Sequence, residues 1–209
     1  MSLADIRRDY LGQPLSETDS DTDPCVQFTR WFEQARETEA DATAMALATA
    51  TPDGRPSVRI VLLKGIDDRG FVFYTNYQSR KARELEATGR ASLLFTWRSL
   101  ERQVRVDGTV EKVSAAESDA YFASRPIESR WSVYASRQSE VVDSRETLEL
   151  LFNAARERYE DEVPRPDWWG GYRVLPDEFE FWQGRPSRMH DRLRYLRQGG
   201  AWRRDRLAP

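Results

Sequence analysis

The one histidine of this 209-residue chain, His190, lies in a densely charged segment. Arg188 and Arg192 stand two positions to either side, and Asp191 follows directly. An imidazole has an ordinary pKa of about 6.5, which neighbouring charges move readily. Guanidiniums favour the neutral ring and a carboxylate favours the charged one. A mixed-charge surface strand is the ordinary alternative for a lone histidine, so other segments must decide whether His190 does chemistry.

Arg80 and Lys81 follow Ser79 where a helix is predicted to begin directly after a strand. The free N–H groups and positive dipole of a helix N-terminus attract anions. Two cations oppose that dipole, and a bound phosphate would remove the conflict. The segment therefore indicates a phosphate site, with a solvated basic turn as the alternative.

Tyr121 and Arg125 are four residues apart, so they share one face of a predicted helix that Pro126 ends. Ser129 follows the break. Two hydroxyls and a guanidinium are suited to holding a phosphate. In the alternative, Arg125 only pairs with the last carbonyls of its own helix.

Arg59 and Lys64 are predicted on one strand, five positions apart. Side chains alternate along a strand, so an odd spacing places these two on opposite faces. The spacing therefore favours two separate anionic groups over a single phosphate held by both.

Residues 168–172 and 179–184 combine aromatic side chains with glycines. Such aromatics usually fill a core, but they also form walls for a flat heterocycle. The chain has no G-x-G-x-x-G, Walker or G-x-S-x-G motif and no metal-ligand cluster, so no metal is expected. Phosphate sites and a flat aromatic slot without a nucleotide fold indicate FMN or a similar phosphorylated ring.

The elements that must position these residues are mainly strands. Residues 44–51, 58–64 and 71–75 are predicted to form an antiparallel meander. Further strands are predicted at 91–97, 103–113, 171–174, 178–183, 191–196 and 201–206, with a bulge at 107–108. Helices are predicted at 25–40, 79–87, 114–124 and 144–159. This pattern indicates an antiparallel β-barrel with peripheral α-helices.

Composition limits the class of protein. A net charge of −3 argues against a general nucleic-acid binder, and no segment has the roughly 20 apolar residues of a membrane span. A single cysteine, Cys25, indicates a reducing compartment, and we expect a cytoplasmic protein. Residues 1–23 are polar and are expected to form a mobile arm or lid, followed by one domain over residues 24–209.

Several long motifs resemble the pyridoxine/pyridoxamine 5′-phosphate oxidase family, in family order from Arg7 to Pro209. They are Arg59-Ile60-Val61-Leu62-Leu63-Lys64, Phe73-Tyr74-Thr75-Asn76, Ser79-Arg80-Lys81-Ala82, Leu100-Glu101-Arg102-Gln103-Val104, Trp169-Gly170-Gly171, Glu180-Phe181-Trp182-Gln183-Gly184, Arg188-Met189-His190-Asp191-Arg192 and Arg206-Leu207-Ala208-Pro209. The resemblance implies a homodimeric split β-barrel that binds FMN at the subunit interface. It also implies oxidation of pyridoxamine or pyridoxine 5′-phosphate to pyridoxal 5′-phosphate, with O₂ as acceptor and H₂O₂ as product.

The resemblance also implies roles for individual positions. The FMN site would comprise Arg59, Ile60, Val61, Leu62, Leu63, Lys64, Tyr74, Thr75, Arg80, Lys81, Gln103, Gln138, Ser139, Trp182 and Arg192. The substrate phosphate would be held by Lys64, Tyr121, Arg125 and Ser129. Arg188 and His190 would contact the pyridine ring, with Asp41 close by, and Arg7, Arg8 and Tyr10 would form a lid.

Three alternatives remain at this point. The chain could be a non-catalytic FMN- or pyridoxal-phosphate-binding module, which would produce no H₂O₂. It could be a different flavin oxidoreductase of the same barrel class, which a substrate profile would reveal. It could also be an RNA-binding barrel that uses residues 192–206, which predicts salt-sensitive binding and no visible absorbance.

Overall fold

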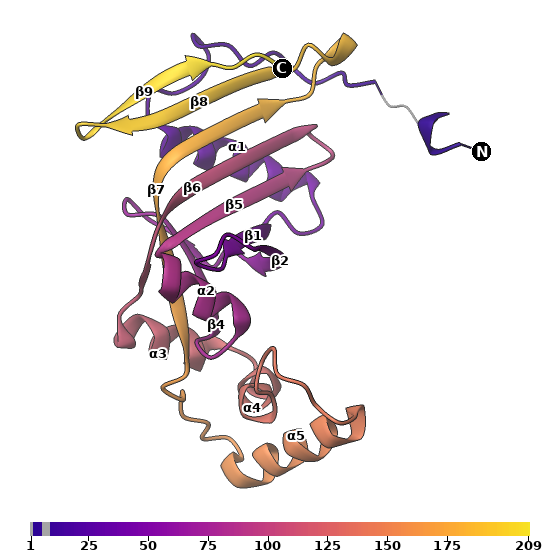
Figure 1. Ribbon diagram of the computed structural model, residues 1–209, viewed down its shortest axis with the longest axis vertical. Coiled ribbons are helices and arrows are strands. Elements are labelled where there is room, and N and C mark those ends of the chain that lie inside the picture. Colours follow the sequence, from indigo (N-terminus) through magenta and orange to yellow (C-terminus); the bar gives the residue numbers. More distant parts are fainter. Residues whose placement is uncertain (1, 6–8) are drawn as a thin grey trace.

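The strands form one strongly curled antiparallel sheet in the computed structural model, which describes residues 2–5 and 9–209 (Figure 1). Seven strands follow the order β2-β1-β5-β6-β7-β4-β3, and β8 and β9 continue from the far half of β7. The strands are β1 (Ala44–Ala50), β2 (Pro56–Leu62), β3 (Gly65–Ile66), β4 (Phe71–Asn76), β5 (Arg90–Trp97), β6 (Arg102–Lys112), β7 (Trp169–Gln183), β8 (Asp191–Gln198) and β9 (Ala201–Arg206). The predicted antiparallel barrel-like fold is confirmed.

Strand β7 is the axis of this sheet, because β6 pairs along its length while β4 and β8 pair with its two halves. The β6–β7 register shifts between Asp107 and Gly108, which confirms the predicted bulge. A Cβ at Gly108 would lie 2.1 Å from the carbonyl oxygen of Leu175, so only glycine allows this close approach. Sequence alone divided β7 in two, whereas it continues through Pro176, and the extra residue of the bulge is the next one, Asp177.

The predicted three-strand meander is wrong. β1 and β2 do form a hairpin, but β2 ends the sheet and does not pair with β4. Instead β4 pairs with β7, in a register that joins Phe71 to Val174 and Asn76 to Trp169. Long-range pairing decided this topology, and residues 58–75 contain no local signal for it.

The helices that pack around the sheet are α1 (Pro24–Thr38), α2 (Arg80–Thr88), α3 (Ala115–Ser124), α4 (Ile127–Ala135) and α5 (Arg145–Tyr159). The side chain of Ser79 caps α2 at its start, and Gly89 ends it in the left-handed region at φ +66°. Ser114 caps α3 by accepting from the N–H of Glu117. Helix α4 was not predicted, since its short sequence has no clear apolar period.

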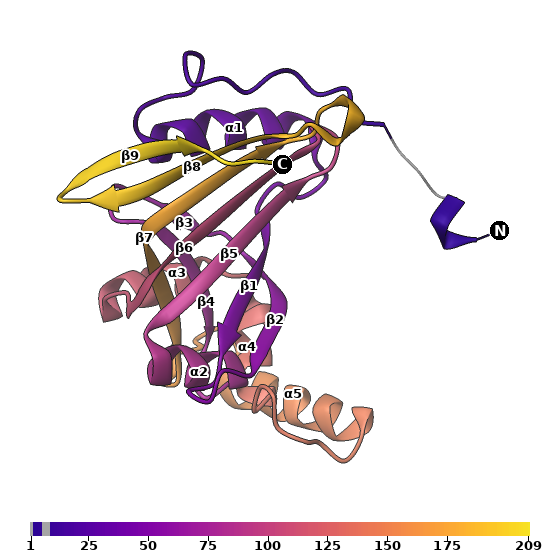
Figure 2. The same ribbon diagram turned by 45° about the horizontal axis from the view of Figure 1, so that its top comes forward.

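One face of the sheet is covered by α1, which crosses it near β7 and β8 (Figure 2). Phe28 packs edge-on against Phe71 and Phe95, and Trp31 packs against Phe181. Phe28, Phe71, Phe95 and Phe181 are all fully buried. This aromatic core fixes the curvature of the sheet and so the position of the strand ends.

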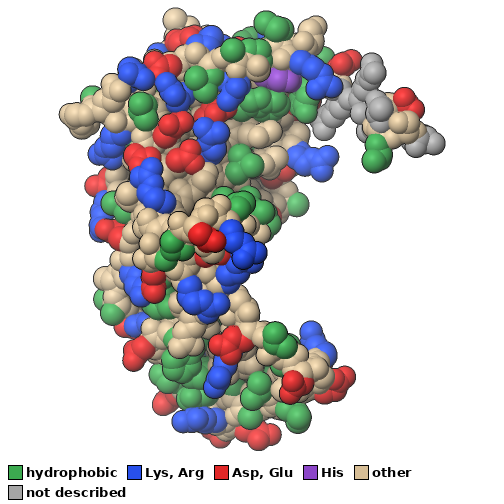
Figure 3. Space-filling view, in the orientation of Figure 1, with side chains coloured by type: hydrophobic (Ala, Val, Ile, Leu, Met, Phe, Trp, Pro, Cys, Tyr) green, Lys and Arg blue, Asp and Glu red, His purple; other side chains and the backbone are tan. Residues whose placement is uncertain are grey.

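A separate small core lies at the other end of the molecule, where Phe122 of α3 and Val133 of α4 pack with Val163 and Trp169. Figure 3 shows the side of the molecule hollowed between this helical end and the β8–β9 end, with Lys and Arg side chains along the hollow.

Residues 10–15 of the N-terminal segment lie on the body of the protein, whereas the short 3-10 helix Leu3–Asp5 stands away from it (Figure 1). The N–H groups of Leu11 and Gly12 donate to the Glu101 carboxylate at 2.7 and 2.9 Å. Leu15 is buried, and its N–H donates to Asp191 at 3.1 Å. Residues 10–15 are therefore anchored by hydrogen bonds.

Candidate functional site

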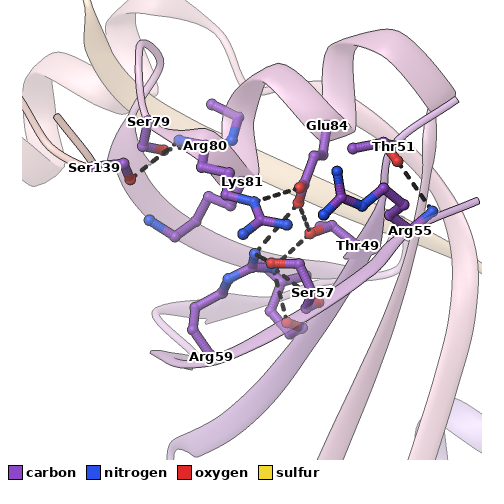
Figure 4. Close-up of polar contacts among 12 residues, drawn as sticks. Thr49, Thr51, Arg55, Ser57, Arg59, Ser79, Arg80, Lys81, Glu84 and Ser139 are labelled. Carbon is purple, nitrogen blue, oxygen red and sulfur yellow. Dashed lines mark hydrogen bonds and ion pairs between the residues drawn. The ribbon is translucent and has the colours of Figure 1, made fainter. Parts of the chain in front are cut away.

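Two arginines hold the buried carboxylate of Glu84 in α2, and a third cation, Lys81, lies on the first turn of the same helix (Figure 4). The carboxylate of Glu84 accepts from Nε of Arg80 at 2.8 Å and from Nη2 of Arg59 at 3.3 Å. Nearby, Nζ of Lys81 donates to Oε1 of Gln138 at 2.6 Å. One carboxylate does not neutralise three cations, so the cluster retains an excess of positive charge. A phosphate dianion fits this donor set.

Lys81 is the most perturbed of these cations. Burial lowers its pKa to about 8, and the charge of Arg59 adds to that effect. Its Nζ also donates to Oγ1 of Thr75 at 3.2 Å. The N–H of Arg80 donates to Oγ of Ser139 at 3.2 Å, so residues 138–139 close over the helix start. A bound anion would raise the pKa of Lys81 back toward its ordinary value.

Beside this cluster opens a cleft of about 320 Å³. Its lining residues are Arg59, Ile60, Val61, Leu62, Lys64, Tyr74, Thr75, Asn76, Lys81, Tyr121, Arg125, Gln138 and Trp169. Four predicted residues of this region lie outside the lining, and two of them, Arg80 and Ser139, belong to the neighbouring cluster at the start of α2. Leu63 is buried in the core, and Ser129 lies on the first turn of α4.

Arg59 and Lys64 both line this cleft, and the prediction that they bind separate anionic groups stays a prediction. β2 ends at Leu62, before Lys64. The N–H of Lys64 instead donates to the carbonyl of Val72 in β4 at 2.8 Å. The alternation of a regular strand therefore does not extend to Lys64.

Stacked aromatic rings form one wall of the cleft. The rings of Tyr74 and Tyr121 are 3.8 Å apart at 16°, and Trp169 continues the stack. The guanidinium of Arg125 lies 4.7 Å from the Trp169 ring centroid. Burial raises the pKa of Tyr74 to about 12 and lowers that of Arg125 from its ordinary value.

Nη1 of Arg125 is buried and has no hydrogen-bond partner within the described chain. A buried donor without an acceptor costs free energy, which an acceptor placed beside it would recover. Since Arg125 lines the cleft together with Lys64, an anionic oxygen in the cleft is such an acceptor. This orphaned donor favours the phosphate prediction over simple helix capping.

The second group of predicted residues surrounds His190. Its ring packs against Trp182 at 4.7 Å and edge-on against Tyr10 at 5.2 Å. Nδ1 accepts from the N–H of Arg185 at 3.1 Å, which requires a lone pair on that nitrogen. Burial and the charge of Arg188 both lower the pKa of His190, so the ring is neutral at pH 7.

Asp191 does not face the imidazole. Its carboxylate accepts from the N–H of Leu15 at 3.1 Å and from Nη1 of Arg206 at 2.8 Å. The neighbour that would favour a charged His190 is therefore turned away. Of the two opposing influences expected from the sequence, the guanidinium of Arg188 prevails.

Backbone strain accompanies this group. Ser187 and Arg188 both adopt left-handed conformations, at φ +56° and +59°. Such conformations cost roughly 1–2 kcal/mol each for non-glycine residues and concentrate at functional sites. The strained turn places Arg188 on the surface beside His190.

A second hollow of about 300 Å³ adjoins this group, lined by Tyr10, Thr96, Trp97, Arg98, Glu101, Arg102, Gln103 and Trp182. Gln103 and Trp182 are neighbours in the β6–β7 register. Arg192 donates from Nε to Glu180 at 2.7 Å and from Nη1 to the carbonyl of Ala208 at 2.8 Å. The C-terminal residues thus help to hold Arg192.

The two groups are far apart within one chain. Trp169 of the cleft begins β7, and Gln183 ends it next to Trp182. A strand rises about 3.3 Å per residue, so these 15 residues extend on the order of 40 Å, far more than one small ligand spans. Figure 1 likewise places β8 and α4 at opposite ends.

Asp41 joins neither group. Asp41 is exposed before β1, where its carboxylate accepts from the N–H and hydroxyl of Thr43. Arg7 and Arg8 lie outside the described residues.

Sequence reasoning missed Glu84 and the lining residue Asn76. The only local signal for Glu84 is its place four residues after Arg80 on a helix. Nothing in the sequence pairs it with Arg59, which comes from the edge of the sheet.

Across residues 2–5 and 9–209 there is no cluster of three or more His, Cys, Asp or Glu that suits a metal ion. The same residues include no helix with the length and apolar character to span a membrane.

The family model described as pyridoxamine 5′-phosphate oxidase matches residues 32–159, and that of the pyridoxine 5′-phosphate oxidase C-terminal dimerisation region matches 169–209. Pyridoxine/pyridoxamine 5′-phosphate oxidase of Thermosynechococcus vestitus is 57% identical over 99% of both chains. The Rubrobacter xylanophilus protein of that name is 58% identical over 99% of this chain and 96% of its own. The solved structure of PhzG from Burkholderia lata, in complex with tetrahydrophenazine-1-carboxylic acid, matches with a TM-score of 0.89 and 36% identity, covering 95% of this chain and 99% of that one. This chain therefore belongs to the pyridoxamine 5′-phosphate oxidase family and is an oxidoreductase.

Proposed function

We propose that this enzyme uses FMN to oxidise pyridoxamine 5′-phosphate and pyridoxine 5′-phosphate to pyridoxal 5′-phosphate. The amine reaction consumes O₂ and water and releases ammonia and H₂O₂, whereas the alcohol reaction consumes O₂ and releases H₂O₂. One observation carries the proposal: an aromatic-walled cleft lies beside the cation cluster of α2, and this cleft contains the buried, unpartnered Nη1 of Arg125. The names of the closely similar relatives support the same reaction.

The FMN phosphate would bind at the start of α2, where Arg59, Arg80 and Lys81 supply charge and Ser139 supplies a hydroxyl. Oε1 of Gln138 accepts from Thr75 and from Lys81, and all three residues would bind FMN. When bound, FMN supplies the hydride acceptor and the route for electrons to O₂. The chain binds and orients the reactants.

The substrate phosphate would bind in the 320 Å³ cleft. Lys64 and Arg125 supply positive charge there, and Tyr121 supplies a phenol group. Ser129 would join through its hydroxyl from the first turn of α4. Anchoring the phosphate would fix the position of the reacting C4′ carbon relative to the flavin ring, so binding energy is used for alignment.

The pyridine ring would meet Arg188 and His190, with Tyr10 as part of a lid. Because roughly 40 Å of β7 separates these residues from the cleft, they would come from a second copy of the chain. The match of residues 169–209 to a dimerisation region supports a homodimer with FMN at the interface. Gln103, Trp182 and Arg192 would then contact the flavin from that second copy.

Nδ1 of neutral His190 accepts from the Arg185 N–H, so Nε2 carries the ring hydrogen and would donate a hydrogen bond near C4′. Arg188 would stabilise negative charge on the pyridine ring. Asp41 has no contact with either group, so we assign it no step. We further propose a cytoplasmic location, where the lone thiol of Cys25 stays reduced.

A spectrum of the purified protein tests this function. The expected result is a yellow protein whose absorption of blue light is lost when pyridoxamine 5′-phosphate is added without oxygen. Admitting air should restore the absorption and produce H₂O₂. A colourless protein that cannot be reconstituted with FMN would refute the proposal. A yellow protein that bleaches with tetrahydrophenazine-1-carboxylic acid, the ligand of PhzG, but not with B6 phosphates would indicate another oxidoreductase.

A further inference from the structure

A buried carboxylate within a phosphate site requires an explanation. Glu84 is 4% exposed and lies between two of the cations proposed to bind the FMN phosphate. Its negative charge repels a phosphate, so direct electrostatics alone would weaken binding. Retaining it there is favourable only if it improves the geometry of the cations.

Each oxygen of Glu84 has a defined partner (Figure 4). Oε1 accepts from Nε of Arg80 at 2.8 Å. Oε2 accepts from Oγ1 of Thr49 at 2.5 Å and from Nη2 of Arg59 at 3.3 Å. Burial raises the pKa of this carboxyl, but the bonds from Thr49 and Arg80 outweigh burial, and the pKa lies below its ordinary value.

Thr49 completes the arrangement from β1. Its buried hydroxyl donates to Glu84 and accepts from Nη1 of Arg59 at 2.6 Å. The same nitrogen also donates to the carbonyl of Leu47 at 3.1 Å. The guanidinium of Arg59 is thus held on its strand before any ligand arrives.

These contacts leave both Nη nitrogens of Arg80 without a bond to Glu84, and the Arg80 side chain is 55% exposed. A long exposed arginine has many rotamers, and fixing it costs entropy on binding. The salt bridge to Glu84 restricts these rotamers in advance. Preorganisation of this kind increases affinity without adding a contact to the ligand.

We infer that Glu84 is a positioning residue that holds Arg59 and Arg80 in place for the FMN phosphate. This inference rests on the proposed function, because it needs FMN as the ligand. It differs from a purely structural role in one respect: its effect must depend on the phosphate group.

The test compares binding of FMN and riboflavin to the apoprotein of Glu84→Gln by fluorescence titration. Riboflavin has the same ring and ribityl chain without the phosphate. The glutamine keeps one acceptor oxygen but turns an amide N–H₂ toward a guanidinium, so one arginine is released. We expect FMN affinity to fall by about tenfold or more, as lost bonds to charged groups typically cost, with riboflavin affinity nearly unchanged.

Three further variants separate an effect on the phosphate site from a general effect on folding. Glu117→Gln removes a carboxylate from the buried Arg173, away from this cluster, and should leave the FMN-to-riboflavin ratio unchanged. Thr49→Val should lower the ratio in the same direction as Glu84→Gln, whereas Thr49→Ser, which keeps the hydroxyl, should restore it. Thermal unfolding of each apoprotein reports any general loss of stability.

The outcomes separate the two proposals. If the wild-type apoprotein does not bind FMN, the proposed function fails. If the wild type binds FMN and Glu84→Gln keeps the preference for FMN over riboflavin, the carboxylate does not act on phosphate binding and this inference is wrong. If Glu84→Gln increases that preference, the carboxylate acts only by repulsion and the inference is likewise wrong. A loss of affinity for both ligands to the same extent would also overturn it, since that result indicates a structural role alone.

Discussion

The protonation state of His190 is determined by the groups that contact its ring more than by the residue next to it in sequence. The adjacent Asp191 is occupied by Leu15 and Arg206, while Arg185, five residues away, donates its N–H to Nδ1. A protonated ring carries hydrogen on both nitrogens and could not accept that bond. The neutral state is therefore part of the local geometry.

This geometry predicts an acid limb in catalysis. The pKa of His190 lies below its ordinary 6.5, so the ring stays neutral at pH 7 and protonates only as the pH falls further. We expect kcat/KM for pyridoxamine 5′-phosphate to fall with an inflection below pH 6.5, and His190→Asn to remove that contribution. Substrate groups titrate identically in both proteins, so the difference profile isolates the ring. Profiles of the same shape in the two proteins would contradict this role.

The unpartnered nitrogen of Arg125 makes a second prediction at this scale. Arg125→Met should raise KM for pyridoxamine 5′-phosphate by about tenfold or more, because a charged hydrogen bond to phosphate is lost. The comparison substrate is pyridoxamine, whose already weak turnover should change little. Arg145→Met, at an exposed position on α5, serves as the matched control. An equal loss with both substrates would mean that Arg125 only supports the fold.

Among the elements, the β6–β7 bulge brings the backbone of Gly108 close to that of Leu175. A Cβ at Gly108 would meet backbone at 2.1 Å, whereas one at Gly89 would meet nothing within 4 Å and would only be strained by φ +66°. Gly89→Ala should cost about 1 kcal/mol, roughly 2–4 °C in Tm. Gly108→Ala should lower the Tm at least twice as much, because the two strands must separate. Thermal unfolding of both apoproteins at one protein concentration measures this, and equal shifts would argue against the close approach.

Local signals explain which elements the sequence could predict. The capping residue Ser79 and the helix-ending Gly89 mark α2, and the Asp107-Gly108 pair marks the bulge. The pairing of β4 with β7 joins residues about a hundred positions apart, and no local pattern encodes it. For the same reason Glu84 was missed, since its partner Arg59 comes from another element. The cleft shared by Arg59 and Lys64 depended on where β2 ends, which alternation alone does not indicate.

At the scale of the whole molecule, the predicted site residues divide into two groups at opposite ends of β7. The family motifs gave the residues but not this division, which appears only when the length of β7 is known. A homodimer that brings the cleft of one copy to His190 of the other would complete two identical sites. We therefore propose that each site is shared between two chains.

Mixed dimers test that claim most directly. Arg125→Ala and His190→Ala chains, carrying different tags, are co-expressed and the mixed dimer is purified. A shared site predicts one intact site per mixed dimer and about half the wild-type kcat/KM for H₂O₂ formation, whereas each variant alone has about a tenth of the wild-type value or less. The reciprocal control pairs a chain with both substitutions with a wild-type chain, which should be nearly inactive. The opposite pattern, an inactive first dimer and a half-active second one, would show that both groups act within one chain and would contradict the account.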